Sequence, residues 1–192
     1  MAKKEFKGVN ITLPTCRLAY PVLFEKQYND LKKKEEWAVT MLFSKGTDLS
    51  KLKAAMVKAA HLEFGADVDL NTLDLKRIID GDTKDNDYMK GSFVVKAATR
   101  LKAPGVVDSQ LQAILDPTEI YSGVHANVNV TVKAYTKPNQ GVTLYLNHVQ
   151  KVKDGEQIVG GPKANDVFDE LDIDESEVSN GQTSAVPDAM FG

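Results

Sequence analysis

The sequence predicts a mainly β protein, a Greek-key barrel with one main α-helix and a disordered acidic C-terminal tail. Two observations in the body predict the barrel: apolar residues alternate with polar ones in several stretches, and a single stretch has helical spacing. A third predicts the tail, because residues 165–192 hold eight acids and no Lys or Arg. We therefore expect one folded domain over residues 1–164 and a tail over residues 165–192.

The predicted strands show period-two alternation and are bounded by turn residues. In chain order they are residues 9–13, 16–20, 36–43, 92–100, 124–135 and 142–149. The last two form a hairpin, because a Pro, an Asn and a Gly lie between them. On this alternation His148 falls on the apolar face of its strand, as a core residue.

One helix is predicted between the third and fourth strands. Apolar residues recur at helical spacing from Leu49 to Ala60, Thr47 or Asp48 can cap its start, and Gly65 follows its end. Many short strands, a hairpin and a single helix are typical of an OB-fold-like barrel. A plain β-sandwich fits the strand pattern nearly as well.

Residues 70–87 form an acidic, irregular stretch, with one short helical turn expected over residues 73–79. The acids between Asp80 and Asp87 suggest a cation-binding loop, but Gly81 comes too early and no Glu closes the loop. We interpret this segment as a solvated turn and expect no metal site. A nuclease that uses these carboxylates with a divalent metal is an alternative.

Motifs of enzymatic chemistry are missing from the sequence. It has no glycine-rich phosphate loop, no G-x-S-x-G and no H-E-x-x-H, and Cys16 is its single cysteine. No run of about 18 apolar residues is present, and no apolar stretch follows the basic N-terminus. We therefore expect a cytoplasmic binding protein without enzymatic activity, cofactor or membrane contact.

The outer strand faces carry mixed basic and aromatic residues, a pattern typical of single-stranded nucleic-acid binding. Cations follow the phosphates while rings stack on bases, and neither contact needs a fixed sequence. The candidate DNA-binding residues are Arg17, Trp37, Lys96, Arg100, Lys133, Tyr135 and Tyr145. Trp37 shares its strand face with three apolar residues, so a core role fits the pattern as well as a stacking role.

Charge separates the body from the tail. Residues 1–164 hold all 24 basic residues and 19 of the 27 acids, a formal charge of +5. The tail buries too little to offset its ordering entropy, yet apolar anchors among its acids suit docking into a basic, hydrophobic groove. Its candidate partner-binding residues are Asp169, Glu170, Asp172, Asp174, Glu175 and Phe191. The alternative is a solubilising tail with incidental apolar residues.

Several segments, in order along residues 8–161, together carry a family resemblance. They are Trp-Ala-Val-Thr at 37–40, Asp-Gly-Asp at 80–82, Lys-Ala-Pro-Gly-Val-Val-Asp at 102–108, Tyr-Ser-Gly-Val at 121–124, Lys-Ala-Tyr at 133–135, and residues 141–156. They closely resemble a bacteriophage family of single-stranded-DNA-binding proteins, first catalogued as a domain of unknown function. The resemblance implies an OB-fold that coats single-stranded DNA in phage replication, recombination or repair, without base specificity.

The tail is similar to those of phage and bacterial single-strand binders, which recruit replication proteins and compete with DNA for the groove. The resemblance implies a phage or host polymerase or helicase as partner, in the cytoplasm of an infected bacterium. Phe191 matches the aromatic end of such tails, although here Gly192 separates it from the carboxylate. The sequence leaves open whether the protein assembles into a homo-oligomer. The alternative function is a protein-interaction or phage structural module without nucleic-acid binding.

Overall fold

The computed structural model describes residues 7–158. The predicted boundary at residue 164 and every candidate residue of the tail therefore lie outside the described residues. The strands are β1 (Gly8–Thr12), β2 (Cys16–Asn29), β3 (Lys34–Ser44), β4 (Ile78–Asp80), β5 (Ser92–Thr99), β6 (Gly105–Val107), β7 (His125–Tyr135) and β8 (Gly141–Lys153). The helices are α1 (Ser50–Phe64) and four short 3₁₀ turns at Leu70–Thr72, Gly81–Thr83, Asp87–Met89 and Pro117–Glu119.

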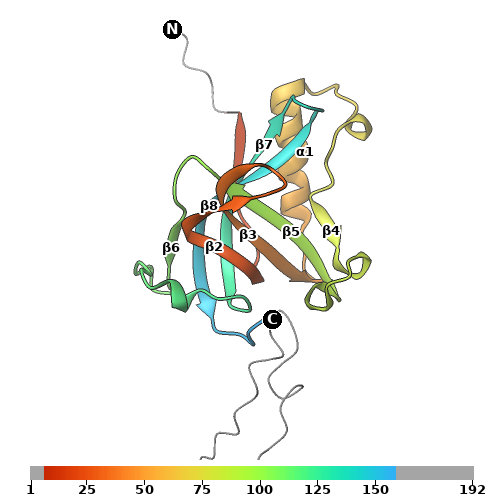
Figure 1. Cartoon of the computed structure of the whole chain (residues 1–192). Coiled ribbons are helices and arrows are strands. Elements are labelled where there is room, and N and C mark those ends of the chain that lie inside the picture. Colours follow the sequence, from red (N-terminus) through yellow and green to blue (C-terminus); the bar gives the residue numbers. More distant parts are fainter. Residues whose placement is uncertain (1–6, 159–192) are drawn as a thin grey trace, which may run out of the picture. The chain divides into compact units, whose positions relative to one another are not determined.

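Five of the strands close into a barrel in the order β2-β3-β5-β8-β7, with β7 returning to pair with β2 (Figure 1). All neighbours in this ring are antiparallel except β5 and β8, which run parallel and meet at Ala98 and Tyr145. β1 extends the sheet beside β7, β6 beside β8 and β4 beside β5. This closed five-strand topology with one main helix confirms the predicted OB-fold-like barrel.

The core lies inside the barrel and beneath α1. Met41 and Phe43 of β3 are fully buried, as is Val130 of β7, and the apolar face of the helix joins the same cluster. Figure 1 shows α1 alongside β7. The helix begins one residue later than the predicted cap: Leu49 is the N-cap and makes no side-chain capping hydrogen bond, while the Asp48 carboxylate before it accepts a 2.8 Å hydrogen bond from the Ser50 amide. No helix within residues 7–158 is long and apolar enough to cross a membrane.

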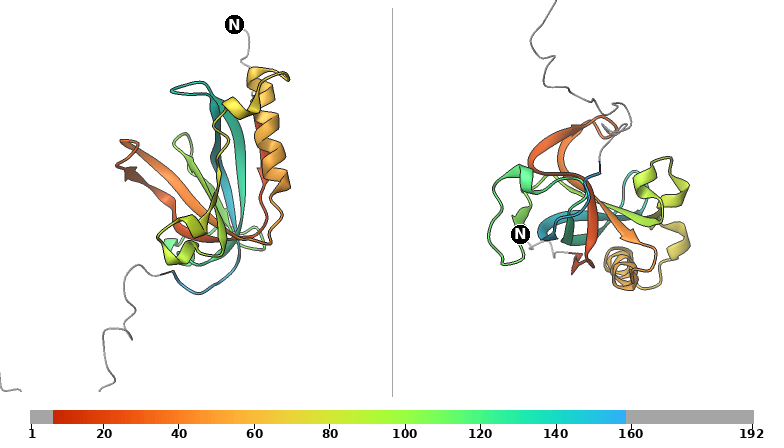
Figure 2. Two further views of the ribbon diagram at one scale, coloured as in Figure 1. Left: turned by 90° about the vertical axis from the view of Figure 1, so that its right-hand side faces the viewer. Right: turned by 90° about the horizontal axis from the view of Figure 1, so that it is seen from below.

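β2 is longer than the alternation predicts. Tyr20 has a positive φ of 48° and Pro21 follows it, so the period-two pattern breaks where the strand bends. Pairing with β3 then resumes through register shifts and continues to Asn29 opposite Lys34. The outer half of this hairpin diverges from the β7–β8 hairpin in the left view of Figure 2, with the end of β5 between them.

Two local predictions are wrong. The register of β7 and β8 shifts between the pairs Val130–Leu146 and Asn129–His148, which turns His148 to the exposed side. Its Nδ1 accepts a 3.2 Å hydrogen bond from the Gly105 amide instead of packing in the core. The helical turn expected over residues 73–79 is also absent, since that segment runs extended into β4.

Candidate nucleic-acid interface

The outward side chains of β3, β5 and β8 form one continuous face. Thr40 of β3 lies opposite Lys96 of β5, and Ala98, two residues further along, pairs with Tyr145 of β8. The alternate residues of these strands point into the core, so barrel closure fixes which side chains share the outer face.

This face is hollowed into a groove of about 880 Å³. The β2–β3 loop borders it through Leu31 and Lys32, Pro138 of the β7–β8 loop borders it elsewhere, and Ala98 lies on its floor. The basic residues that line it are Lys32, Lys34, Lys76, Arg77, Lys96 and Arg100. OB-folds bind oligonucleotides on the face of their second and third strands, between the loops that correspond to these two.

The groove is strongly positive. Four of its cations, Lys34, Lys76, Lys96 and Arg100, are exposed and form no ion pair within residues 7–158. Four uncompensated positive charges in one hollow are a suitable track for a chain of phosphates.

The single acid that lines the groove in the described part of the chain is neutralised. Glu36 is buried, and its Oε1 accepts hydrogen bonds from Lys32 Nζ at 2.6 Å and Asn29 Nδ2 at 2.9 Å. The Asn29 side-chain oxygen in turn accepts bonds from the amides of Leu31 and Lys32, both at 3.1 Å. These bonds fix the β2–β3 turn and place its tip at the groove.

A polar cluster anchors the segment before β4 to the β7–β8 hairpin. Arg77 donates to the Asp74 carboxylate, to the Tyr135 hydroxyl at 2.9 Å and to the Val142 carbonyl at 2.6 Å. The Tyr135 hydroxyl donates to Asp74 at 2.9 Å. Gly141 permits this approach, because a Cβ there would lie 2.7 Å from both the Tyr135 hydroxyl and the Asp74 carbonyl oxygen. The cluster holds Lys76 and Arg77 at the groove.

This cluster also favours one charge state. Burial acts to raise the pKa of the Asp74 carboxyl, but the hydrogen bond from Tyr135 and the charge of Arg77 outweigh it and lower that pKa. Burial and the bond to Asp74 raise the pKa of Tyr135. Asp74 is therefore ionised and Tyr135 neutral near neutral pH.

The structure brings together several of the predicted residues. Lys96, Arg100 and Tyr145 line the groove itself. Lys133 lines a neighbouring hollow of about 710 Å³, which shares Thr99 and Tyr145 with the groove. The two hollows therefore adjoin at Thr99 and Tyr145, and together we call them the β3–β5–β8 trough.

The other predicted residues lie outside the trough or use their polar atoms in contacts within the protein. Arg17 lines a separate hollow and donates to the carbonyl of Glu156. Trp37 is half-buried on the core-facing side of β3, with its indole N–H 3.5 Å from the Phe24 carbonyl and Lys26 Nζ 4.6 Å from its ring centroid. The hydroxyl of Tyr135 is engaged in the cluster described above.

Sequence reasoning missed four cations of the groove: Lys32, Lys34, Lys76 and Arg77. Lys32 and Lys34 belong to a run of three lysines at the turn from β2 into β3, a signal that a search of the sequence for lysine runs could have found. Lys76 and Arg77 sit in the stretch interpreted as irregular, and only tertiary contacts bring them to the barrel.

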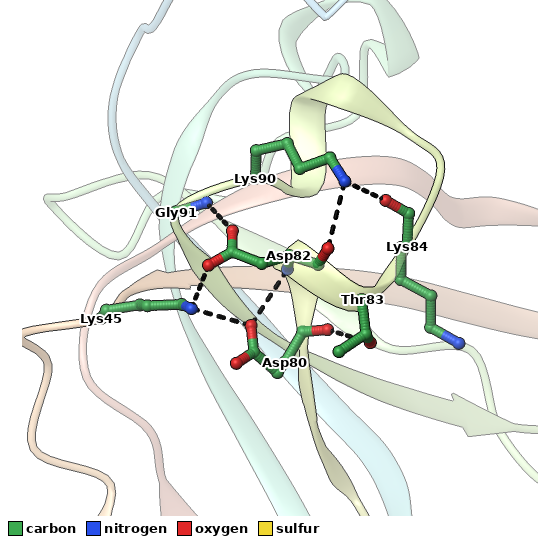
Figure 3. A network of polar contacts seen from close by, with 7 residues as sticks. All are labelled: Lys45, Asp80, Asp82, Thr83, Lys84, Lys90 and Gly91. Carbon is green, nitrogen blue, oxygen red and sulfur yellow. Dashed lines mark hydrogen bonds and ion pairs between the residues drawn. The ribbon is translucent and has the colours of Figure 1, made fainter.

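The acidic turn after β4 makes polar contacts to nearby lysines of the chain (Figure 3). Lys45 Nζ contacts the carboxylates of both Asp80, at 2.9 Å, and Asp82. Asp82 also accepts a 2.7 Å hydrogen bond from the Gly91 amide. Hydrogen bonds from Lys45 lower the pKa of both carboxyls. Within residues 7–158 no group of three or more acids, histidines or cysteines is placed to hold a metal ion.

The chain is similar to several phage proteins. A family model described as "Enterobacter phage Enc34, ssDNA-binding protein" matches residues 9–178. A relative, "Putative protein p50" of Acyrthosiphon pisum secondary endosymbiont phage 1, is 28% identical over 180 residues, which cover 88% of this chain and 97% of that protein.

Solved structures share the barrel. The single-stranded DNA-binding protein from bacteriophage Enc34, in complex with ssDNA, superposes with a TM-score of 0.66 at 22% identity and covers 82% of this chain and 97% of that one. The single-stranded DNA binding protein gp2.5 of bacteriophage T7 gives a TM-score of 0.55 at 17% identity, over 89% of this chain and 100% of the other. At these identities the likeness shows the fold.

Proposed function

Because the chain belongs to the family of the single-stranded-DNA-binding protein of Enterobacter phage Enc34, we propose that its β3–β5–β8 trough binds single-stranded DNA without regard to sequence. The chain is a phage single-stranded-DNA-binding protein, a non-enzymatic class.

The proposed contacts follow the geometry of the trough. Lys96, Arg100, Lys34 and Lys76 neutralise successive phosphates of the backbone. The ring of Tyr145, at the junction of the two hollows, stacks on a base, and Lys133 continues the phosphate track beyond it. Phosphates and the π-faces of bases are common to every sequence, so contacts of this kind do not select one.

One observation carries the proposal: four exposed, unpaired cations and an aromatic ring line a single hollow on the barrel face that OB-folds use for oligonucleotides. Tyr135, Arg17 and Trp37 line neither hollow of the trough, and this proposal assigns them no contact to DNA. The hydroxyl of Tyr135 instead supports the Asp74–Arg77 cluster beside the groove.

We extend the proposal to the tail. Its acids and Phe191 compete with DNA for the basic trough and, once displaced, recruit a polymerase or helicase of the phage or host. The supporting observations are the opposite charges of tail and trough and the apolar anchors among the acids. In this proposal the protein works in replication, recombination and repair of phage DNA in the cytoplasm of the infected bacterium.

Fluorescence anisotropy tests both parts of the proposal. A labelled dT oligomer and a duplex of the same length are titrated, in buffer without metal, with the full chain and with a chain truncated after Gly161. We expect both forms to prefer the single strand, and the truncated form to bind more tightly because its competing acids are gone. No binding by either form would favour an interaction or structural module, while equal affinities of the two forms would contradict tail competition.

A further inference from the structure

Two loops of the trough carry leucines that are almost fully exposed. Leu31 at the tip of the β2–β3 loop is 97% exposed and lines the groove. Leu101, just after β5, is 89% exposed and lines the adjoining hollow. Leu31 thus lines one hollow of the trough and Leu101 the other, and the two hollows share Thr99 and Tyr145.

Nothing in the fold uses these two side chains. Neither belongs to the buried core nor to the partly buried residues that pack against it within residues 7–158. Each is set among cations, Leu31 beside Lys32 and Leu101 between Arg100 and Lys102. Apolar side chains beside the cations of a trough suit a ligand that has a charged backbone and flat, apolar base faces.

We propose that Leu31 and Leu101 contact the faces of unstacked bases and close over a DNA strand whose phosphates lie on the cations of the trough. This inference rests on the proposed function and adds the base-contacting residues to it. Tyr145 is the one Phe, Tyr or Trp ring that lines the trough among the described residues, so apolar side chains of the loops are the next candidates for contacts to further bases on the track. Aliphatic side chains fill that role without hydrogen bonds and so without sequence preference.

The chain supplies its own matched control. Leu111 and Leu115 are 71% and 83% exposed, lie in the loop after β6 and line neither hollow of the trough. The double variants L31A/L101A and L111A/L115A therefore remove the same number of exposed apolar atoms from two different surfaces. Both are expected to keep the melting temperature of the wild type, because neither leaves a cavity.

The experiment compares a dT oligomer with an abasic deoxyribose-phosphate oligomer of the same length, titrated with the full chain and both variants. We expect L31A/L101A to bind dT about fivefold to tenfold more weakly, with unchanged affinity for the abasic strand and an unchanged salt dependence. L111A/L115A should match the wild type on both strands.

Three outcomes overturn the inference while wild-type binding to dT stands. They are an L31A/L101A affinity for dT equal to that of the wild type, an equal loss on the abasic strand, and an equal loss in L111A/L115A. Failure of the wild type itself to bind dT would instead overturn the proposed function, so the two failures are distinguishable.

Discussion

Tyr145 is the residue on which the proposed interface depends most. It faces outward from β8, pairs across the parallel seam with Ala98, and is one of two side chains that line both hollows of the trough. Lys96 of β5 and Arg100, the residue after the end of β5, flank Ala98 and line the same groove as Tyr145, so both can meet the phosphates of a base stacked on the ring.

Replacing Tyr145 by Ala should weaken binding to a dT oligomer by about 1–3 kcal/mol, the usual contribution of one stacked base. Tyr145→Phe keeps the ring and should bind as the wild type does. The comparison is made by anisotropy, with circular dichroism melting to verify that both variants fold. A Phe variant as weak as the Ala variant would assign the effect to the hydroxyl and exclude stacking.

At the level of elements, the segment before β4 depends on the Asp74–Arg77–Tyr135 cluster. The pKa of Asp74 is lowered in the fold, so its carboxylate stabilises the protein above the unfolded-state value of about 3.9. That contribution disappears as the pH falls through the lowered folded-state pKa. The segment should therefore detach from the β7–β8 hairpin most easily in acid.

Asp74→Asn should lower the urea midpoint near pH 6, and its difference from the wild type should shrink as the pH falls below about 3.9 and through the lowered pKa of Asp74. Asp67→Asn is the control, because Asp67 is exposed and forms no ion pair within residues 7–158. The measurement is a series of urea unfolding curves across that pH range. A constant difference between the Asp74 variant and the wild type would mean that the ionised carboxylate adds no stability.

Elements were predictable from sequence where local pattern alone decides them. The alternation of β3, β5, β7 and β8 and the spacing of α1 are local, and the structure has all five close to the expected bounds. The outer half of β2 was missed because a positive φ at Tyr20 breaks its period. β4 and β6 have three residues each, too few for any periodicity to show.

The residues of the candidate site also divide into those that the local sequence pattern places and those that it does not. Lys96, Arg100 and Tyr145 could be placed on outer faces from alternation alone, and the barrel brings them together. His148 could not, because a single register shift between β7 and β8 reverses its side. Lys76 and Arg77 reach the groove through hydrogen bonds to residues about 60 positions away, which no local pattern encodes.

For the whole molecule, the charge of the trough sets how binding responds to salt. The five cations of the proposed phosphate track predict a slope of about −3.5 in log affinity against log salt for a single strand, or about a 100-fold loss between 50 and 200 mM. K96A/R100A should reduce the slope to about −2. K51A/K53A, on the exposed side of α1, should leave it unchanged. Anisotropy titrations across the salt series measure all three, and equal slopes would remove Lys96 and Arg100 from the phosphate track.

Closure of the barrel also determines how readily two copies of the protein can join through their sheets. A sheet that ends in a long unpaired strand invites its neighbours to add to it, which leads to aggregation. Here β2, β3, β5, β8 and β7 satisfy one another in a ring, and the strands appended to that ring, β1, β4 and β6, have only three to five residues. The part of β2 that projects from the ring carries Pro21, Glu25 and Lys26, residues that discourage a further strand from pairing. The described part of the chain therefore offers a second copy few backbone groups with which to extend the sheet.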